Sequence, residues 1–413
     1  MLRRVLYGVG FGIAALVAPG GGVAAAGECD GTGKVEICHA PPAHPENART
    51  LRVSCSAWPP HELHGDSFGA CAEDRRCERF GTTELFARVP AEPGYPEGIA
   101  VDRGVVYVGV PSRLDRPTSG PELVHAFDAR SGAPRTDFPV TPDPGQPRSL
   151  TGMAVDAQGR LYVAEVRGIV RIDPLSGAEE LYAGPFANLP SCDAAPPGSD
   201  CSPVPFVDDR EPLLNDIGFD DDGHLYVTDS AQATIWRVPP GASAGPRAPE
   251  IWFQDARIHS ANGANGIQVH PDAPLVYFAE TIGGVIYTLP LVDAPGAGDL
   301  AVFHAFDPLV TGPHGPDGLV FGESGRLYVT LAGANQVAVL EPDGELAALF
   351  PDALSNLQQP VPYDSPASID FHPQRGSLLV VNHALFSNNP SSFAVLEACV
   401  QDDPGRIPRP EVP

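Results

Sequence analysis

Positive charge is scarce in this sequence. Only 26 of the 413 residues are Lys or Arg, against 52 Asp and Glu, so the formal net charge is −26. A surface this acidic repels phosphate groups, and we therefore expect neither nucleic acid nor a membrane as a partner. The negative surface also attracts cations, although a requirement for solubility would by itself explain the acidic composition.

Long apolar runs are absent beyond the N-terminus. There, Arg3 and Arg4 precede an apolar run from Val5 to Val17, and Ala24–Ala26 offers a small-residue cleavage site. This pattern predicts a signal peptide over residues 1–26 rather than a membrane span, because the run is too short to cross a bilayer. We expect a secreted or periplasmic protein.

Motifs for nucleotide chemistry are also missing. The chain contains no Gly-x-Gly-x-x-Gly dinucleotide motif and no Gly-x-x-x-x-Gly-Lys phosphate loop. These absences argue against a nicotinamide-dependent or nucleotide-hydrolysing enzyme.

The chain contains one hairpin pattern that is repeated six times. In the copy at Asn215 to Ser230, an apolar strand, an Asp-Gly turn and a second apolar strand follow one another. The copies are 50 to 64 residues apart and begin at Pro96, Leu150, Leu214, Ala264, Pro316 and Pro366. Such a period is typical of solenoids and propellers, and two hairpins per repeat make a four-stranded blade. We predict an all-β fold, a six-bladed β-propeller over residues 80–400 with a C-terminal tail at 401–413.

The residue two positions before the first apolar residue of each copy would lie at the mouth of the central channel. Around the ring these residues are Glu97, Thr151, Asn215, Asn265, Asp317 and Ala367. Two carboxylates and two carboxamides are hard oxygen ligands that suit calcium or magnesium, whereas structural zinc would favour Cys or His. The alternative is that Asn and Asp before Gly only form turns.

Here the chain resembles the SMP-30/gluconolactonase-like six-bladed propellers, relatives of sugar-lactone lactonases, over about Tyr95 to Val400. The motifs that carry the resemblance are Glu97-Gly98, Asn215-Asp216, Asn265-Gly266 and Pro316-Asp317-Gly318, in that order along the blades. The resemblance implies a divalent cation held by Glu97, Asn215, Asn265 and Asp317. Calcium is the first choice for this cation, with magnesium, manganese or zinc as alternatives. One departure concerns the substrate: sugar-acting members often have Arg where this chain has Leu213.

A cation at the mouth would polarise the carbonyl of a lactone or ester, and a nearby carboxylate could serve as general base. The candidates for this base at the outer ends of second strands are Glu165, Asp229 and Glu280. Asp229 is the first choice because it shares a hairpin with Asn215, and Asp317 could instead be both ligand and base. Substrate contacts are expected from His259, His314 and Glu280. The alternatives are turn-capping acids and ordinary loop histidines.

The chain has 8 Cys, and an even number in an exported protein predicts disulfides. Cys192 and Cys201 flank a Pro/Gly/Ser-rich insertion, and a Cys77–Cys399 bridge would lock the ring. Because the insertion at Gly184 to Pro212 directly precedes Asn215, we expect it to form a lid over the channel mouth.

Residues 27–79 differ in composition from the rest of the chain, because they are rich in Cys and His. They resemble a short segment that is attached to assorted bacterial secreted proteins. One hypothesis is a metal site formed from Cys38, His39, His61 or His64, and Cys71, whose types suit zinc. The alternative is a disulfide-bonded mini-domain with surface histidines.

Two functions remain open from the sequence. The first is a secreted, divalent-metal-dependent hydrolase (a lactonase or esterase) acting on a small-molecule lactone or ester. The second is a non-catalytic, NHL-like propeller that binds a ligand or protein partner around a structural cation, because the fold alone does not separate the two.

Overall fold

A computed structural model of the chain describes residues 33–39, 41, 49–63, 65–68, 77–112, 122–141, 149–165, 168–203, 211–241, 245–258, 263–311 and 315–413. The chain divides into two compact units, Met1–Cys71 and Ala72–Pro413. The predicted signal peptide lies outside the described residues. No helix in the described ranges is long and apolar enough to cross a membrane.

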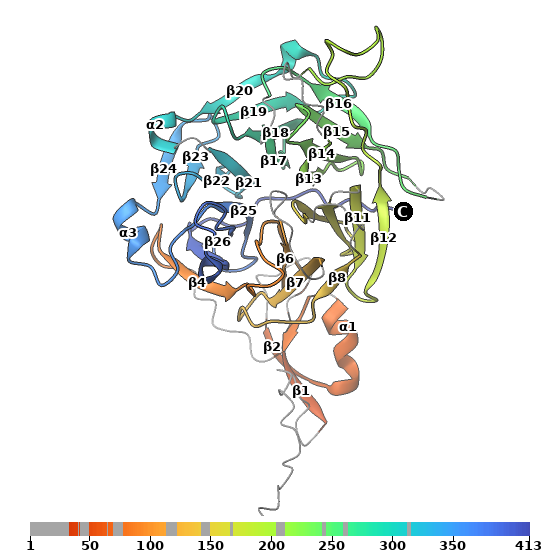
Figure 1. Cartoon of the computed structure of the whole chain (residues 1–413). Helices are drawn as coiled ribbons and strands as arrows, with labels where there is room; N and C mark the ends of the chain where they lie inside the picture. The colour runs from red at the N-terminus through yellow and green to blue at the C-terminus, as the bar shows by residue number, and fades with distance from the viewer. Residues whose placement is uncertain are drawn as a thin grey trace, which may run out of the picture. The chain divides into compact units, whose positions relative to one another are not determined.

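The second unit is a ring of six four-stranded antiparallel blades, the six-bladed β-propeller predicted from the sequence (Figure 1). The first blade contains β5 (Ile99–Asp102), β6 (Val105–Val110), β7 (Glu122–Asp128) and β8 (Phe138–Val140). The second contains β9 (Met153–Val155), β10 (Leu161–Glu165), β11 (Gly168–Asp173) and β12 (Ala178–Ala183). The third contains β13 (Leu214–Phe219), β14 (Leu225–Asp229), β15 (Thr234–Val238) and β16 (Glu250–Gln254).

The remaining blades repeat this order. The fourth contains β17 (Ala264–Val269), β18 (Leu275–Glu280), β19 (Val285–Pro290) and β20 (Ala301–Ala305). The fifth contains β21 (Pro316–Phe321), β22 (Leu327–Leu331), β23 (Gln336–Leu340) and β24 (Leu346–Phe350). The sixth contains β25 (Pro366–Phe371), β26 (Ser377–Asn382), β27 (Ala394–Cys399) and β4 (Thr83–Arg88). Short helical turns, α2 (Pro308–Thr311), η3 (Ala297–Asp299), α3 (Ala353–Leu357) and η4 (Pro390–Ser392), lie between strands.

The innermost strands of the six blades, β5, β9, β13, β17, β21 and β25, contact one another around the channel. Buried hydroxyls join consecutive blades: Thr228 donates to the carbonyl of Asn265 at 2.7 Å, and Thr281 donates to that of Pro316 at 2.7 Å. Apolar side chains fill the spaces between blades, as in the cluster that contains Tyr162, Phe219 and Trp236.

Several channel-mouth residues are followed by glycine because the backbones of neighbouring inner strands lie very close together at these positions. A Cβ added at Gly98 would lie 1.7 Å from the carbonyl oxygen of Thr151, and one at Gly266 would lie 2.2 Å from that of Asp317. Real Cβ atoms do not come this close to backbone, so only glycine fits. The Glu-Gly, Asn-Gly and Asp-Gly motifs are therefore a packing requirement of the ring.

We predict that Gly266→Ala lowers the free energy of unfolding by about 1–3 kcal/mol, because the neighbouring strand must move. Gly298→Ala is the matched control, since an added Cβ there meets nothing within 4 Å, and it should stay within about 0.5 kcal/mol of wild type. Urea unfolding of both variants measures this. Equal stabilities would show that the inner strands are not tightly packed at this position.

The ring closes by pairing its two ends. β27 pairs with β4, the first strand of the unit, and Cys77 is bonded to Cys399. The predicted ring-locking disulfide is thus confirmed, as is Cys192–Cys201.

We predict that Cys77→Ser/Cys399→Ser destabilises the protein by about 3 kcal/mol more than Cys192→Ser/Cys201→Ser. The first bridge spans 322 residues and the second spans 9, and a longer closed loop restricts the unfolded chain more. Denaturant unfolding of the two double variants measures the difference. A larger loss from the short bridge would contradict this account of the closure.

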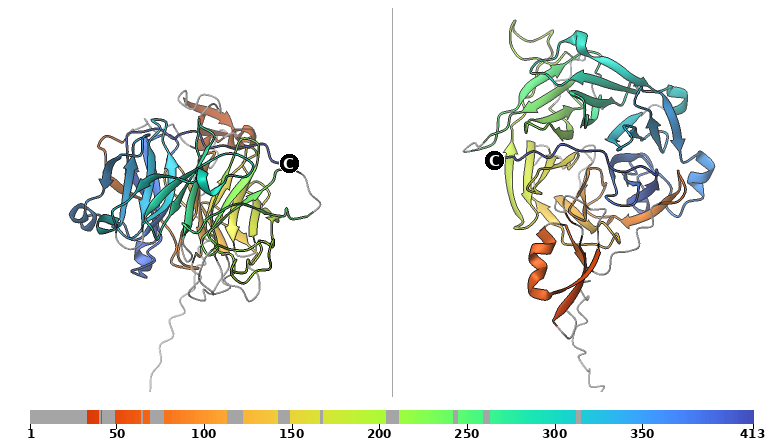
Figure 2. Two further views of the ribbon diagram at one scale, coloured as in Figure 1. Left: turned by 90° about the horizontal axis from the view of Figure 1, so that it is seen from above. Right: turned by 180° about the vertical axis from the view of Figure 1, so that it is seen from behind.

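The C-terminal tail crosses the end of the channel opposite to the predicted ligands (Figure 2, right). Gly405 donates to the carbonyl of Phe321 at the end of β21, and Arg409 bonds the carboxylate of Asp102 at the end of β5. Further on, the carbonyl of Pro410 accepts from Ala157 in the second blade at 3.0 Å. The tail thus covers the end of the channel where the inner strands finish.

The first unit contains a three-stranded sheet with the order β2-β1-β3. Its elements are β1 (Lys34–His39), β2 (Arg49–Ser54), η2 (Cys55–Ala57), α1 (Trp58–Leu63) and β3 (Ser67–Phe68). Cys38 and Cys55 are both disulfide-bonded. The sequence left open whether Cys38 is a metal ligand or part of a disulfide. The structure shows the disulfide, so Cys38 is not a thiolate metal ligand.

Candidate functional site

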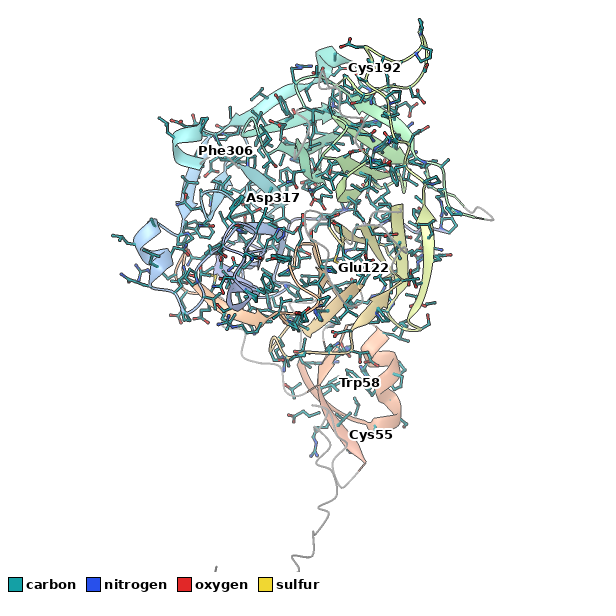
Figure 3. The ribbon with its side chains drawn as sticks, in the orientation of Figure 1. Cys55, Trp58, Glu122, Cys192, Phe306 and Asp317 are labelled. Atoms are coloured by element: carbon teal, nitrogen blue, oxygen red, sulfur yellow. A yellow bond between two sulfur atoms is a disulfide. The ribbon has the colours of Figure 1, made fainter. Side chains whose placement is uncertain are left out.

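The four predicted ligands lie at the same end of the inner strands. Asn215, Asn265 and Asp317 are the second residues of β13, β17 and β21, and Glu97 lies two residues before β5. The pairing of β13, β17 and β21 shifts register at these residues, a β-bulge that breaks the strand ladder and can re-aim a side chain. Asp317 is labelled near the centre of the ring in Figure 3.

The carboxyl groups at this end influence one another. Burial raises the pKa of Glu97 well above its usual range, and the negative charges of Asp317 and Asp216 raise it further. Burial, helped by the charge of Asp216, also raises the pKa of Asp317 to about 7, against an opposing hydrogen bond from Asn265. These mutual effects indicate that the three carboxyl groups lie close together.

Asn265 offers an oxygen without a protein partner. Its Nδ2 donates to Thr281 Oγ1 at 3.0 Å, which fixes the orientation of the amide. Its Oδ1 is buried and has no hydrogen-bond partner among the described residues. A buried carbonyl oxygen that lacks a donor is costly, so the oxygen is suited to a cation or water.

Asp216 is a member of the site that the sequence reasoning did not single out. It occupies the position where four other blades have glycine, and its Oδ2 accepts the N–H of Ile267 in the next blade at 2.9 Å. Its Oδ1 accepts its neighbour's N–H at 2.9 Å. Burial raises its pKa to about 6, although these two N–H groups oppose the shift. The departure from glycine in an otherwise regular repeat was the signal that could have found it.

A cavity of about 60 Å³ lies in the channel beyond Asp216. Its lining comes from the middle of the inner strands and from the tail, including Asp370 and Arg409. The volume suits a few waters rather than a substrate.

The structure does not place Asp229 as a general base. The side chain is completely buried, and its Oδ1 accepts three backbone N–H groups, those of Leu213 at 3.0 Å, Ala231 at 3.0 Å and Gln232 at 3.2 Å. Its Oδ2 accepts Gln232 Nε2 at 2.7 Å and Trp236 Nε1 at 3.1 Å. With five donors and no solvent contact, Asp229 organises the turn, and the catalytic assignment made from the sequence is wrong.

Glu280 has a similar structural position. It is completely buried at the end of β18, and its Oε2 accepts the N–H of Gly283 at 2.6 Å. Glu165 is also buried, at the end of β10. This burial does not fit the substrate contact predicted for Glu280 or the base role considered for both. His259 and His314, the other predicted contacts, lie outside the described residues.

The disulfide loop is not over the channel mouth. Figure 3 shows Cys192 at the outer edge of the ring, far from Asp317 in this view. The base of the loop is held there because Leu189 donates to Gln232 Oε1 at 2.6 Å and Ser202 donates to the carbonyl of Gln232 at 2.8 Å. The lid prediction is therefore wrong for this loop, and residues 204–210 of the same insertion lie outside the described residues.

Residues 198–357 match a family model described as the SMP-30/Gluconolactonase/LRE-like region. This part of the propeller is similar to the SMP-30/gluconolactonase-like family. The resemblance predicted from the sequence is confirmed, and the match covers the blades that carry Asn215, Asn265 and Asp317. No curated protein matches the chain at the sequence level.

Solved structures show the same fold. A calcium-binding protein, regucalcin, from Agrobacterium tumefaciens is 18% identical over 80% of this chain and 96% of its own, with a TM-score of 0.54. A gluconolactonase from Xanthomonas campestris is 20% identical over 78% of this chain and 91% of its own, with a TM-score of 0.50. A luciferin-regenerating enzyme is 15% identical over 80% and 98%, with a TM-score of 0.54.

We predict that calcium raises the melting temperature more at pH 8 than at pH 5. The raised pKa values of Glu97, Asp216 and Asp317 mean that the cation-free native state holds more protons than the unfolded chain between about pH 4 and pH 7. Stability from this site therefore falls as pH rises through that window, and a cation that binds only the native state restores it. Thermal unfolding with and without calcium at both pH values measures the effect.

Asp317→Asn is the control for this experiment, because it removes one of the charges that the cation would offset. The calcium-dependent shift should then become small at both pH values. An equal shift at pH 5 and pH 8 in wild type would contradict the link between the carboxyl groups and the cation.

Proposed function

We propose that this protein is a divalent-cation-dependent hydrolase that opens a lactone or small ester at the channel mouth. The observation that carries the proposal is the meeting of Glu97, Asp216 and Asp317 beside the unpartnered Oδ1 of Asn265. A fold shared with a gluconolactonase and with a calcium-binding protein supports it.

The residues present fit a hard cation. Glu97, Asn215, Asn265 and Asp317 would hold it through oxygen atoms, with calcium as the first choice. When bound, the cation would supply Lewis-acid polarisation of the substrate carbonyl. Asp216 would add negative charge next to the ligands. Its carboxylate is held by two backbone N–H groups, so we assign it a positioning role rather than a role as ligand.

Asp317 is the proposed general base. It is half-buried at the mouth, unlike Asp229, and so can be reached by water. In the cation-free protein, burial and the charge of Asp216 raise its pKa to about 7, and a bound cation would lower this pKa and keep the carboxylate ionised. Its carboxylate would take a proton from the water that attacks the carbonyl.

The shape of the channel limits how substrate reaches these groups. The tail covers the far end, so substrate and product would use the mouth where the ligands lie. Leu213, at the position where sugar-acting members often have Arg, offers an apolar side chain, while its N–H is bonded to Asp229. We propose a substrate less polar than an aldonolactone.

Export of the protein is also proposed. The N-terminal pattern of Arg3, Arg4 and a short apolar run supports it, as do the disulfides, which persist in oxidising compartments.

The second candidate is a non-catalytic propeller with a structural cation. Its support is the burial of Asp229 and Glu280, which removes two of the carboxylates expected to take part in catalysis. Cation binding is common to both candidates, and turnover of a substrate separates them.

The test combines calorimetry with a substrate panel. We predict that Asp317→Asn and Asn265→Ala weaken calcium binding by at least about 100-fold, since each removes a ligand, and abolish hydrolysis of any lactone or ester that wild type opens. The matched control is Asp370→Asn. Asp370 is another channel carboxyl with a pKa raised to about 6 by burial, but it accepts the N–H of Val101 at 2.8 Å farther along the channel.

Asp370→Asn should keep calcium affinity within about threefold of wild type. Calcium binding that survives Asp317→Asn and Asn265→Ala would contradict the ligand assignment. Binding that both variants abolish, in a protein that hydrolyses no member of the panel, would favour the non-catalytic candidate.

A further inference from the structure

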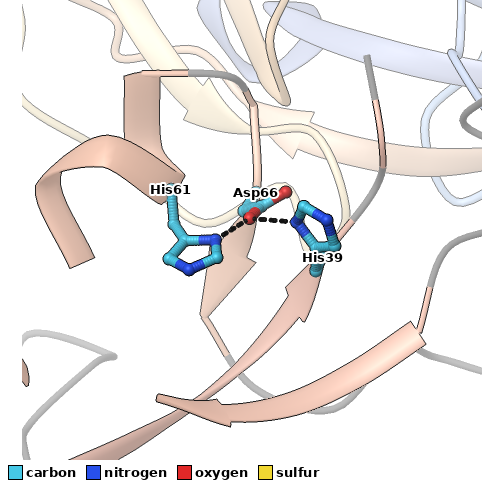
Figure 4. A group of neighbouring side chains, drawn as sticks. All are labelled: His39, His61 and Asp66. Atoms are coloured by element: carbon cyan, nitrogen blue, oxygen red, sulfur yellow. Dashed lines mark hydrogen bonds and ion pairs between the residues drawn. The ribbon is translucent and has the colours of Figure 1, made fainter. Parts of the chain in front are cut away.

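Three side chains of the first unit meet at one point. His39 ends β1, His61 belongs to α1, and Asp66 directly precedes β3 (Figure 4). The Nδ1 of His39 lies 2.7 Å from Asp66 Oδ2, and the Nδ1 of His61 lies 2.5 Å from the same oxygen. The ligand-capable atoms of the three residues are all within 4.8 Å of one another.

The backbone of the module fixes this meeting. β1 pairs with β3 so that Cys38 faces Ser67, which brings the adjacent residues His39 and Asp66 together. The N–H of Asp66 donates to the carbonyl of His61 at 3.1 Å, so the turn after α1 holds these two residues in place. Cys38, next to His39, is disulfide-bonded and further restrains the strand. The constellation is therefore built by three elements rather than by one mobile loop.

The three side chains differ in their exposure to solvent. The side chain of Asp66 has no exposed surface, whereas those of His39 and His61 are 18% and 20% exposed. A buried carboxylate needs a positive partner, which can be a protonated imidazole or a metal ion. The two imidazoles are partly exposed, so an ion could approach the group through them.

We propose that His39, His61 and Asp66 form a binding site for a divalent cation of the zinc class. Two imidazole nitrogens and one carboxylate oxygen are ligands that zinc and cobalt favour, whereas calcium prefers oxygen alone. Ligand atoms about 2.0–2.1 Å from a tetrahedral zinc are about 3.3 Å apart. Each imidazole nitrogen would thus move less than about 1 Å away from Asp66 Oδ2, and the two imidazole nitrogens, now within 4.8 Å of each other, would close to about 3.3 Å.

Three protein ligands leave a coordination position for water or another small ligand, which is the pattern of catalytic rather than structural zinc sites. The site differs from the metal site considered from the sequence, because Cys38 is disulfide-bonded and Asp66, which was not considered, supplies the anionic ligand. His64 and Cys71 lie outside the described residues. Its mixed nitrogen and oxygen donors also distinguish it from the channel mouth, where the donors are oxygens only.

The experiment measures zinc and cobalt binding to the full chain in the Asp317→Asn background, so that the channel mouth contributes little. Zinc is titrated in competition with a chromophoric chelator, and cobalt is followed by its visible absorption, which reports the coordination geometry. We expect one equivalent of zinc and a cobalt band of four- or five-coordinate type. His39→Ala, His61→Ala and Asp66→Asn should each weaken zinc binding by at least about 100-fold and remove the band.

His304→Ala is the matched control, because His304 is half-buried in the propeller and its Nδ1 bonds the carbonyl of Gly344 at 2.8 Å. It should retain both signals. Far-UV circular dichroism and disulfide content show whether each variant is folded. If the chain with all three residues intact takes up no zinc, or if zinc and the cobalt band survive the three substitutions, the trio is only a hydrogen-bonded group and the proposal is wrong.

Discussion

The close approach of the six inner strands is the constraint on which the rest of the structure depends. Backbone atoms of neighbouring blades come so near at Gly98 and Gly266 that no side chain fits. Because the inner strands are held at this distance, the residue before each glycine is held at the channel mouth. The packing that closes the ring therefore also brings Glu97, Asn265 and Asp317 together from distant parts of the sequence.

The same closeness creates an electrostatic cost. Burial and mutual repulsion raise the pKa values of Glu97 and Asp317, and Asp216 adds a further charge where other blades have glycine. The carboxylate of Asp216 links two blades through the N–H of Ile267, but folding does not explain why the carboxyl groups of Glu97 and Asp317 lie beside it, whereas a cation site requires such a group of anions. The charges at the mouth are thus better explained by binding than by folding.

Hydrophobic periodicity and turn chemistry predicted the propeller, and the cysteines next to its first and last blades predicted the Cys77–Cys399 bridge. The repeat also predicted that the four candidate ligands lie at one end of the inner strands. Sequence reasoning failed where the environment of a single side chain decides its role. Asp229 and Asp317 are both acids at hairpin ends, but only the structure shows that Asp229 is enclosed by five donors. Asp66 lies 27 residues from His39 in the sequence, and only strand pairing brings the two together.

The central claim is that the oxygen atoms at the channel mouth bind a divalent cation. The most direct test is anomalous diffraction from crystals of the protein grown with manganese, which substitutes for calcium and has a measurable anomalous signal. The account predicts a peak bounded by Glu97, Asn215, Asn265 and Asp317. An empty mouth at saturating manganese, with well-defined density for these four side chains, would contradict it.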